Sequence, residues 1–83
     1  MIKPSEAGRQ AAGRAALARR GELELTQLDV AAAAGVDVQT YRALETGESW
    51  PWAKNLVAIA RALGFEPGEL QQIADGEPVK AAS

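Results

Sequence analysis

Two short helical segments joined by a glycine constrain the fold of this chain more than any other feature. The first runs from Thr26 to Ala34 and the second from Val38 to about Thr46, with Gly35 between them. A glycine just past a helix end readily adopts the left-handed conformation that stops a helix. Two helices joined in this way can cross at roughly 90–120°, which leaves the second helix exposed. This segment is therefore predicted to be a helix-turn-helix.

The side chains at the helix starts support this prediction. Thr26 with Asp29 three residues later resembles a capping box, in which each side chain bonds the backbone N–H of the other residue. Asp37 is predicted to cap the second helix of the pair. Ala31 is small enough for the two helices to approach closely, and Val36 is expected to fill the corner between them.

Three further helices complete an all-α prediction, with no strand pattern. The first helix begins after a Ser5 cap, a fourth begins near Pro51, and a fifth begins at Pro67 with Leu70 and Ile73 facing inward. The fourth helix ends at Gly64, and its apolar stripe has helical spacing: Leu56, Ile59, Ala60 and Leu63.

The first helix is apolar mainly through alanine, and three glycines interrupt it: Gly8, Gly13 and Gly21. Each glycine costs ~1 kcal/mol relative to alanine inside a helix, so this helix must be held by packing. We expect residues 1–83 to form a single domain with a core of about 14–74, a motif at 26–47 and a flexible tail at 76–83. So small a core makes a homodimer plausible on grounds of stability.

Composition excludes several kinds of site. The chain has neither cysteine nor histidine, which removes disulfides, thiolate chemistry, imidazole bases and the usual zinc ligands. No nucleophile–base pair or glycine-rich phosphate loop is evident, so no enzyme activity, metal or cofactor is predicted. With no apolar run of membrane-spanning length and no signal-peptide pattern, we expect a cytoplasmic protein without a membrane partner.

The ordered motif residues resemble the lambda-repressor-like (XRE) family of helix-turn-helix proteins. The resemblance covers about residues 14–74 and implies a compact five-helix DNA-binding domain. It is carried by Leu25-Thr26-Gln27, Val30-Ala31, Gly35-Val36, Tyr41, Leu44-Glu45, Gly47, Pro51, Leu56 and Ile59-Ala60-Arg61-Ala62-Leu63-Gly64-Phe65.

The resemblance implies a role in sequence-specific recognition of operator DNA, with the helix 38–46 in the major groove. Gln27 matches a position that holds a DNA phosphate and braces this recognition helix, and Thr40 can bond a phosphate. The base-facing positions match Val38, Gln39, Arg42 and Ala43. Gln39 could pair with an adenine, Arg42 could reach a guanine or a phosphate, and Val38 could contact a thymine methyl. The alternative for Gln39 and Arg42 is solvated helix surface.

Glu45 matches a glutamate that pairs with an arginine of the first helix. An ungapped alignment sets Arg20 at the partner position, whereas a helix that ends at Gly21 would set Leu17 there. We favour Arg20, which places Gly21 inside the first helix and makes the pair structural.

Charge argues against strong binding to bulk DNA. The net charge is −2, with +4 over residues 1–20 and −6 over residues 21–83. Arg42 is the single basic residue of the motif 26–47. Glu48 directly follows the motif, at a position where related proteins often carry basic or small polar groups. Since non-specific binding rests on cations at phosphates, specific binding is expected to need a dimer or help from the basic first helix.

Trp50 and Trp52 leave two interpretations open. At least one of them is expected to pack on the fourth helix and enlarge an alanine-rich core. An exposed tryptophan beside Pro51 would instead anchor a protein partner, because aromatic residues dominate interface hot spots. The second hypothesis for function is therefore an acidic adaptor of the same fold, including an antitoxin-like role, that binds a protein rather than DNA.

Overall fold

The computed structural model describes residues 3–66 and 68–76, and in these ranges every regular element is an α-helix. The all-α, five-helix prediction is confirmed. The helices are α1 (Glu6–Glu22), α2 (Gln27–Ala34), α3 (Val38–Thr46), α4 (Ala53–Ala62) and α5 (Glu69–Ala74). None of them is long and apolar enough to cross a membrane.

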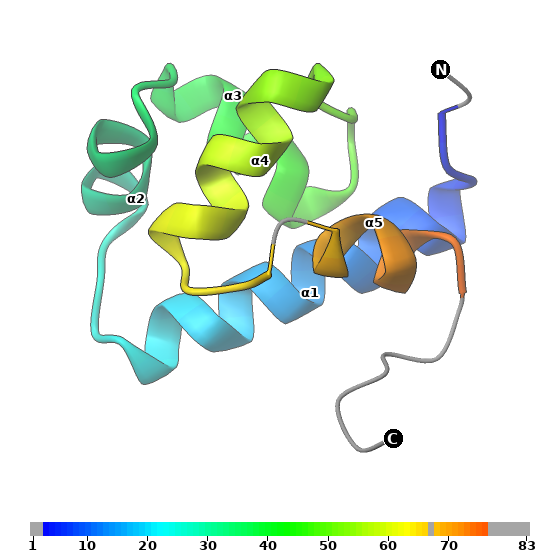
Figure 1. Ribbon diagram of the computed structural model, residues 1–83, viewed down its shortest axis with the longest axis horizontal. Coiled ribbons are helices and arrows are strands. Elements are labelled where there is room, and N and C mark those ends of the chain that lie inside the picture. Colours follow the sequence, from blue (N-terminus) through cyan, green and yellow to red (C-terminus); the bar gives the residue numbers. More distant parts are fainter. Residues whose placement is uncertain (1–2, 67, 77–83) are drawn as a thin grey trace.

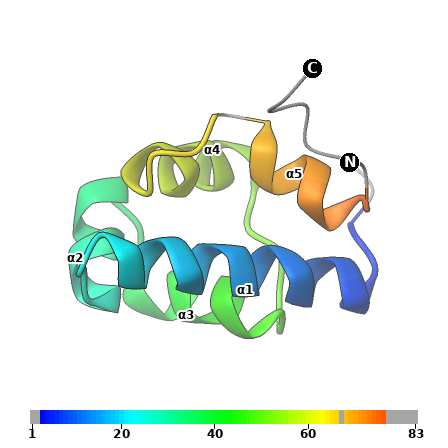
Figure 2. The same cartoon turned by 90° about the horizontal axis from the view of Figure 1, so that it is seen from below.

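The long helix α1 holds the other helices in place. It packs against α3 and α5, while α2 packs against both α3 and α4. In Figure 2, α3 lies on one side of α1, and α4 and α5 lie on the other. Figure 1 shows α2 at one end of the molecule, where it joins the α3 side to the α4 side. The second helix of the motif is thus fixed along one side of a small bundle.

The caps that the sequence predicts are present. The Asp29 N–H donates to the Thr26 hydroxyl at 3.0 Å, and the Thr26 N–H donates to the Asp29 carboxylate at 2.8 Å, which completes the capping box of α2. Asp37 accepts from the Gln39 N–H at 2.7 Å and caps α3. Gly35 ends α2 with a left-handed φ of 70°, the conformation for which glycine is suited.

The start of α4 differs from the prediction. The helix begins at Ala53 with Trp52 as its N-cap residue, so Pro51 precedes the helix instead of occupying its first turn. The cause is the extended backbone of Trp52, with φ −59° and ψ 153°, which keeps Pro51 out of the helical run. Pro67, the predicted start of the fifth helix, lies outside the described residues, and so does the tail beyond Gly76.

All five helices contribute side chains to the core. Its largest fully buried side chains belong to Tyr41, Leu44, Ile59, Leu63, Leu70 and Val30. The apolar stripe of α4 is buried as predicted, Leu70 is buried, and Ile73 is partly buried against the core.

Two of the α1 glycines have a packing role that the sequence did not reveal. A Cβ on Gly13 would lie 2.5 Å from the Leu44 carbonyl oxygen, and a Cβ on Gly8 would collide with the Ala74 carbonyl oxygen. These glycines therefore let α1 approach α3 and α5 more closely than an alanine would allow. The helical cost of glycine is offset by packing at these two positions.

Candidate nucleic-acid interface

Among the residues predicted to contact DNA, two residues of α3 have exposed side chains, Gln39 and Arg42. Tyr41 and Leu44, on the other side of the helix, are fully buried. Positions three apart in a helix share a face, so Gln39 and Arg42 point away from the core in the same general direction. This arrangement fixes the inner side of α3 and leaves its outer side free for a ligand.

The other four residues predicted to contact DNA are less accessible than these two. Val38 is partly buried and packs against the core, while Thr40 and Ala43 are half-buried. Gln27 is also half-buried, at the first position of α2 beside α3. The structure therefore places all the predicted residues on or next to α3, with Gln39 and Arg42 the most prominent.

A chain of hydrogen bonds connects α1, α2 and α3 at this surface. Arg42 Nε donates to Gln27 Oε1 at 3.0 Å, and Gln27 Nε2 donates to Glu45 Oε1 at 2.9 Å. Arg20 Nε, from α1, donates to Glu45 Oε2 at 2.6 Å, and its Nη2 lies 3.3 Å from Glu45 Oε1. We call these four residues the Arg20–Arg42 chain.

The inner end of this chain is well shielded from water. The Glu45 side chain is 6% exposed and the Arg20 side chain 19%. Arg20 Nη1 also donates to the Leu25 carbonyl oxygen at 3.0 Å, so the guanidinium connects α1 to the segment before α2 as well. The alternative partner Leu17 is 47% exposed, and α1 continues past Gly21 to Glu22. The structure therefore contains the Arg20–Glu45 pair.

The surroundings shift the pKa of three groups here. Burial by itself would raise the pKa of Glu45, but hydrogen bonds, first among them the one from Arg20, hold the pKa below its usual value. The Glu45 hydrogen bond raises the pKa of Arg20. Burial raises the pKa of Tyr41, whose hydroxyl has no hydrogen-bond partner of good geometry although the Glu45 charge is near. Glu45 and Arg20 are thus both charged at neutral pH.

Three of the four arginines of α1, Arg9, Arg19 and Arg20, are engaged in the fold, while Arg14 is exposed. Arg9 donates to the carbonyl oxygens of Gly47 and Pro4, and Arg19 donates to the carbonyl oxygen of Leu63. The Arg19 guanidinium also lies 4.2 Å from the centre of the Phe65 ring, a cation–π contact. Together with Arg20, these residues bind carbonyls at helix ends or the Glu45 carboxylate. The basic first helix is therefore less available to DNA than its composition suggests.

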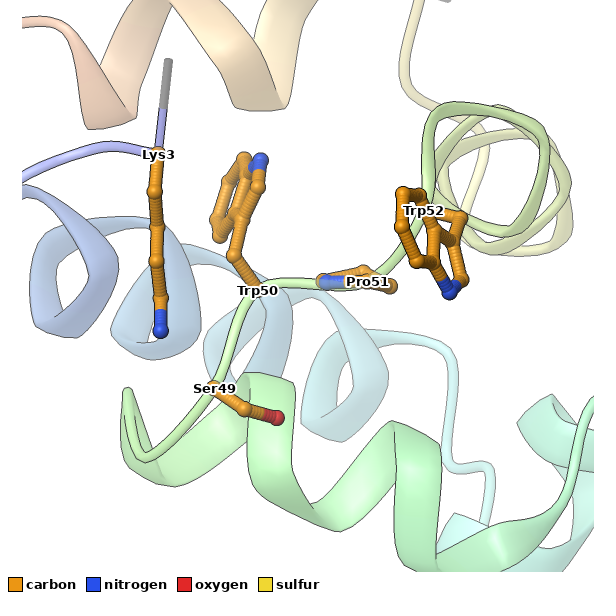
Figure 3. Close-up of a pocket in the computed structure, with 5 residues that line it drawn as sticks. All are labelled: Lys3, Ser49, Trp50, Pro51 and Trp52. Carbon is orange, nitrogen blue, oxygen red and sulfur yellow. The ribbon is translucent and has the colours of Figure 1, made fainter. Parts of the chain in front are cut away.

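The two tryptophans differ in burial. Trp50 is partly buried against the core, and its Nε1 is buried without a hydrogen-bond partner among the residues that the structure describes. Trp52 is 80% exposed. Figure 3 shows them on opposite sides of Pro51, along a cleft of about 240 Å³ that Lys3 and Ser49 also line. Trp50 thus enlarges the core, and Trp52 is left as an exposed aromatic surface.

The resemblance led us to expect that Gln27 braces the recognition helix, but sequence reasoning did not identify Arg42 as the residue that it contacts. These residues are 15 positions apart on different helices, and their bond depends on how closely α2 and α3 cross. The signal that could have found it is the Glu45 carboxylate. As an acceptor, it takes the Gln27 amide N–H and leaves the amide oxygen for a donor on α3.

Comparison with known proteins agrees with this geometry. A family model described as helix-turn-helix matches residues 17–70. No curated protein matches the chain. The restriction-modification controller protein C.AhdI from Aeromonas hydrophila superimposes with a TM-score of 0.71 at 28% identity, over 77% of this chain and 97% of that one.

A crystal structure of the clp gene regulator ClgR from Corynebacterium glutamicum superimposes with a TM-score of 0.68 at 26% identity. The match covers 83% of this chain and 90% of that one. A second ClgR structure gives a TM-score of 0.71 at 25% identity, over 90% of this chain and 78% of that one.

Proposed function

The chain belongs to the XRE-type helix-turn-helix family of DNA-binding transcription regulators, and we propose that it recognises its operator with α3 in the major groove. The observation that carries this proposal is the exposure of Gln39 and Arg42 on the outer side of a helix whose inner side is locked into the core. Gln39 is assigned a polar base contact, and Arg42 is assigned a contact with a guanine or a phosphate. Such a regulator would act in the cytoplasm.

The chemistry of the side chains suits reading of bases. A glutamine amide can pair with N6 and N7 of an adenine, so Gln39 is assigned to an A·T pair. Arg42 is assigned to a cationic contact at the DNA. The exposed parts of Val38 and Ala43 would meet thymine methyl groups, and Gln27 and Thr40 would each donate to a backbone phosphate.

A homodimer would supply what one domain lacks. One α3 contacts only a few base pairs, and the surface around it carries little positive charge. Two copies would present two recognition helices to half-sites one helical turn, about 34 Å, apart. Pairing would also bury additional apolar surface of a small domain.

The first experiment is a binding titration by fluorescence anisotropy. The probes are a duplex from the protein's own promoter region, duplexes selected from a random-sequence library and a scrambled control. We expect wild type to prefer the specific duplexes, with two protomers per site. The double variant Gln39→Ala/Arg42→Ala is expected to lose roughly 100-fold in affinity for them, because each good side-chain–base pair contributes about 1–3 kcal/mol.

The matched control is Arg61→Ala/Gln71→Ala, which removes the same two residue types from α4 and α5. It should bind the specific duplexes like wild type. Unchanged affinity in the α3 double variant would overturn the residue assignments. Melting temperatures of both variants show that each is folded.

A protein-binding adaptor is the second candidate function, favoured by the 80% exposure of Trp52 beside a cleft. Its partner would place an apolar side chain against the Trp52 ring, in the way that aromatic residues anchor interfaces. Failure of wild type to prefer any duplex, even at low salt, would favour this candidate over the regulator.

A further inference from the structure

Within residues 3–66 and 68–76, the exposed Arg42 side chain forms a hydrogen bond at one nitrogen atom, Nε, and none at the other two. Its Nε donates to Gln27 Oε1 at 3.0 Å, and this is the outermost bond of the Arg20–Arg42 chain. Toward the inner end of the Arg20–Arg42 chain lies the Glu45 carboxylate, which is 6% exposed and bound by Arg20. Arg42 is thus connected, through two hydrogen bonds, to one of the most shielded charges on this side of the molecule.

The direction of these bonds follows from the acceptor at the inner end. An ionised carboxylate only accepts hydrogen bonds, so Glu45 requires the NH₂ group of the Gln27 amide. The amide oxygen of Gln27 must then point outward, where it needs a donor. Arg42 supplies that donor through Nε, which leaves the four N–H groups on its Nη1 and Nη2 atoms unused by this bond.

An arginine held at Nε presents its two Nη groups end-on as a fork. Guanine O6 and N7 are two acceptors side by side at the major-groove edge, and an arginine fork meets both at once. A long, exposed arginine ordinarily has considerable rotamer freedom that it loses on binding, and a hydrogen bond already present in the free protein reduces that loss. Contact with a phosphate needs no such orientation, because phosphate oxygens accept from many directions.

We propose that Gln27 is a positioning residue that presents Arg42 to a guanine, and so determines one G·C pair of each half-site. The inference rests on the proposed function and decides between the two contacts open to Arg42, guanine or phosphate. Gln27 acts here through Oε1. Its second amide hydrogen stays available to a phosphate, so the two roles are compatible.

The first test needs no DNA. ¹⁵N relaxation of the arginine Nε–H groups in free wild-type protein compares Arg42 with two internal references. Arg20 Nε is bonded to Glu45, and Arg61 is exposed on α4. We expect the Arg42 Nε–H to be nearly as ordered as that of Arg20. Mobility equal to that of Arg61 would overturn the proposal and would leave DNA binding itself unaffected.

The second test measures base discrimination. A random duplex library is selected with wild type, and each position of the selected site is then replaced in turn by the other three base pairs. We expect one guanine per half-site at which wild type discriminates roughly 10- to 100-fold, with this discrimination lost in Arg42→Ala. Gln27→Met, which keeps the side-chain length but removes both amide bonds, should lose most of it too. Discrimination at the adenine assigned to Gln39 should persist.

The remaining outcomes overturn specific statements. A Gln27→Met variant that weakens binding to all duplexes equally would show a phosphate contact without positioning. A selected site with no Arg42-dependent guanine would overturn the guanine assignment while sequence-specific binding stands. Recovery of no preferred sequence at all would overturn the proposed function together with this inference.

In a Gln27→Met/Arg42→Ala double variant, we expect no loss of guanine discrimination beyond that of Arg42→Ala alone.

Discussion

Glu45 is the residue at which three helices are joined, because it lies on α3 and binds Arg20 of α1 and Gln27 of α2. A Glu45→Ala variant would leave a partly buried guanidinium and an amide without their acceptor. Removing one partner of such a pair costs more than the pair itself contributes. We expect a loss of roughly 2–4 kcal/mol in the free energy of unfolding, which lowers the melting temperature by about 10 °C or more.

Circular dichroism during heating at pH 7 measures this loss, and Glu48→Ala is the control, since Glu48 is exposed just beyond α3. The pH dependence gives a second check. Hydrogen bonds hold the pKa of Glu45 below its ordinary value of 4.5. The stability that the ionised Glu45 contributes is therefore complete above about pH 4.5 and is lost as the pH falls through the folded-state pKa. The difference in the free energy of unfolding between wild type and Glu45→Ala should therefore narrow at acid pH. An equal difference at pH 7 and pH 3 would contradict this account.

At the scale of the helices, the close approach of α1 to α3 depends on Gly13. A Cβ at this position would press on the carbonyl oxygens of Leu44 and Glu45, which belong to the backbone and cannot rotate away. We expect Gly13→Ala to destabilise the protein by about 1–3 kcal/mol, the usual cost of overpacking, despite the better helix propensity of alanine. Chemical denaturation measures the change.

Gly21 provides a matched control on the same helix. A Cβ there would meet nothing within 4 Å, so Gly21→Ala should gain up to about 1 kcal/mol from helix propensity alone. Opposite signs for the two variants are the expected result. A stabilised Gly13→Ala would show that α1 and α3 lie farther apart than described.

Elements with local signals were predictable from the sequence, and those that depend on contacts between helices were not. The ends of α2 and α3 follow from Thr26, Asp37 and the glycines after each helix, so their bounds matched the prediction. The first residue of α4 was misplaced because Trp52 caps it without a side-chain hydrogen bond, which leaves no local signal. The packing role of Gly13 is a tertiary effect that composition cannot reveal.

The candidate site divides in the same way. The family pattern indicated the positions of Gln39, Arg42 and the Arg20–Glu45 pair, because spacing along one helix and a shared alignment determine them. The bond from Arg42 to Gln27 could not be predicted, since it requires the crossing of α2 and α3 and the orientation of one amide. The hydrogen bonds that Arg9, Arg19 and Arg20 of α1 form within the fold could not be predicted for the same reason.

At the scale of the whole molecule, the charge distribution sets how the protein can bind DNA. The net charge is −2, and Arg9, Arg19 and Arg20 each bind groups of the protein itself. Asp37 at the start of α3 and Glu48 just beyond its end are both exposed. Non-specific binding depends on cations that replace counterions at phosphates, so this surface should bind bulk DNA with a Kd near the weak limit of about 10⁻⁴ M. Selection of an operator would then rest mainly on base contacts and on pairing of two copies.

Reversal of one charge beside α3 tests this view. Glu48→Lys replaces a repelling group that follows the recognition helix. We expect a three- to tenfold gain in affinity for scrambled duplexes at about 0.1 M salt. The plot of log K against log salt concentration should become steeper by roughly 1 per bound protomer. Glu66→Lys makes the same change in net charge just after α4, a helix that lies on the side of α1 away from α3 (Figure 2). It should change the affinity and the slope much less, because a lysine on the opposite side would lie more than one Debye length, about 10 Å at 0.1 M salt, from phosphates bound along α3. Equal gains in the two variants would mean that net charge alone governs non-specific binding, and that DNA does not approach this protein along α3.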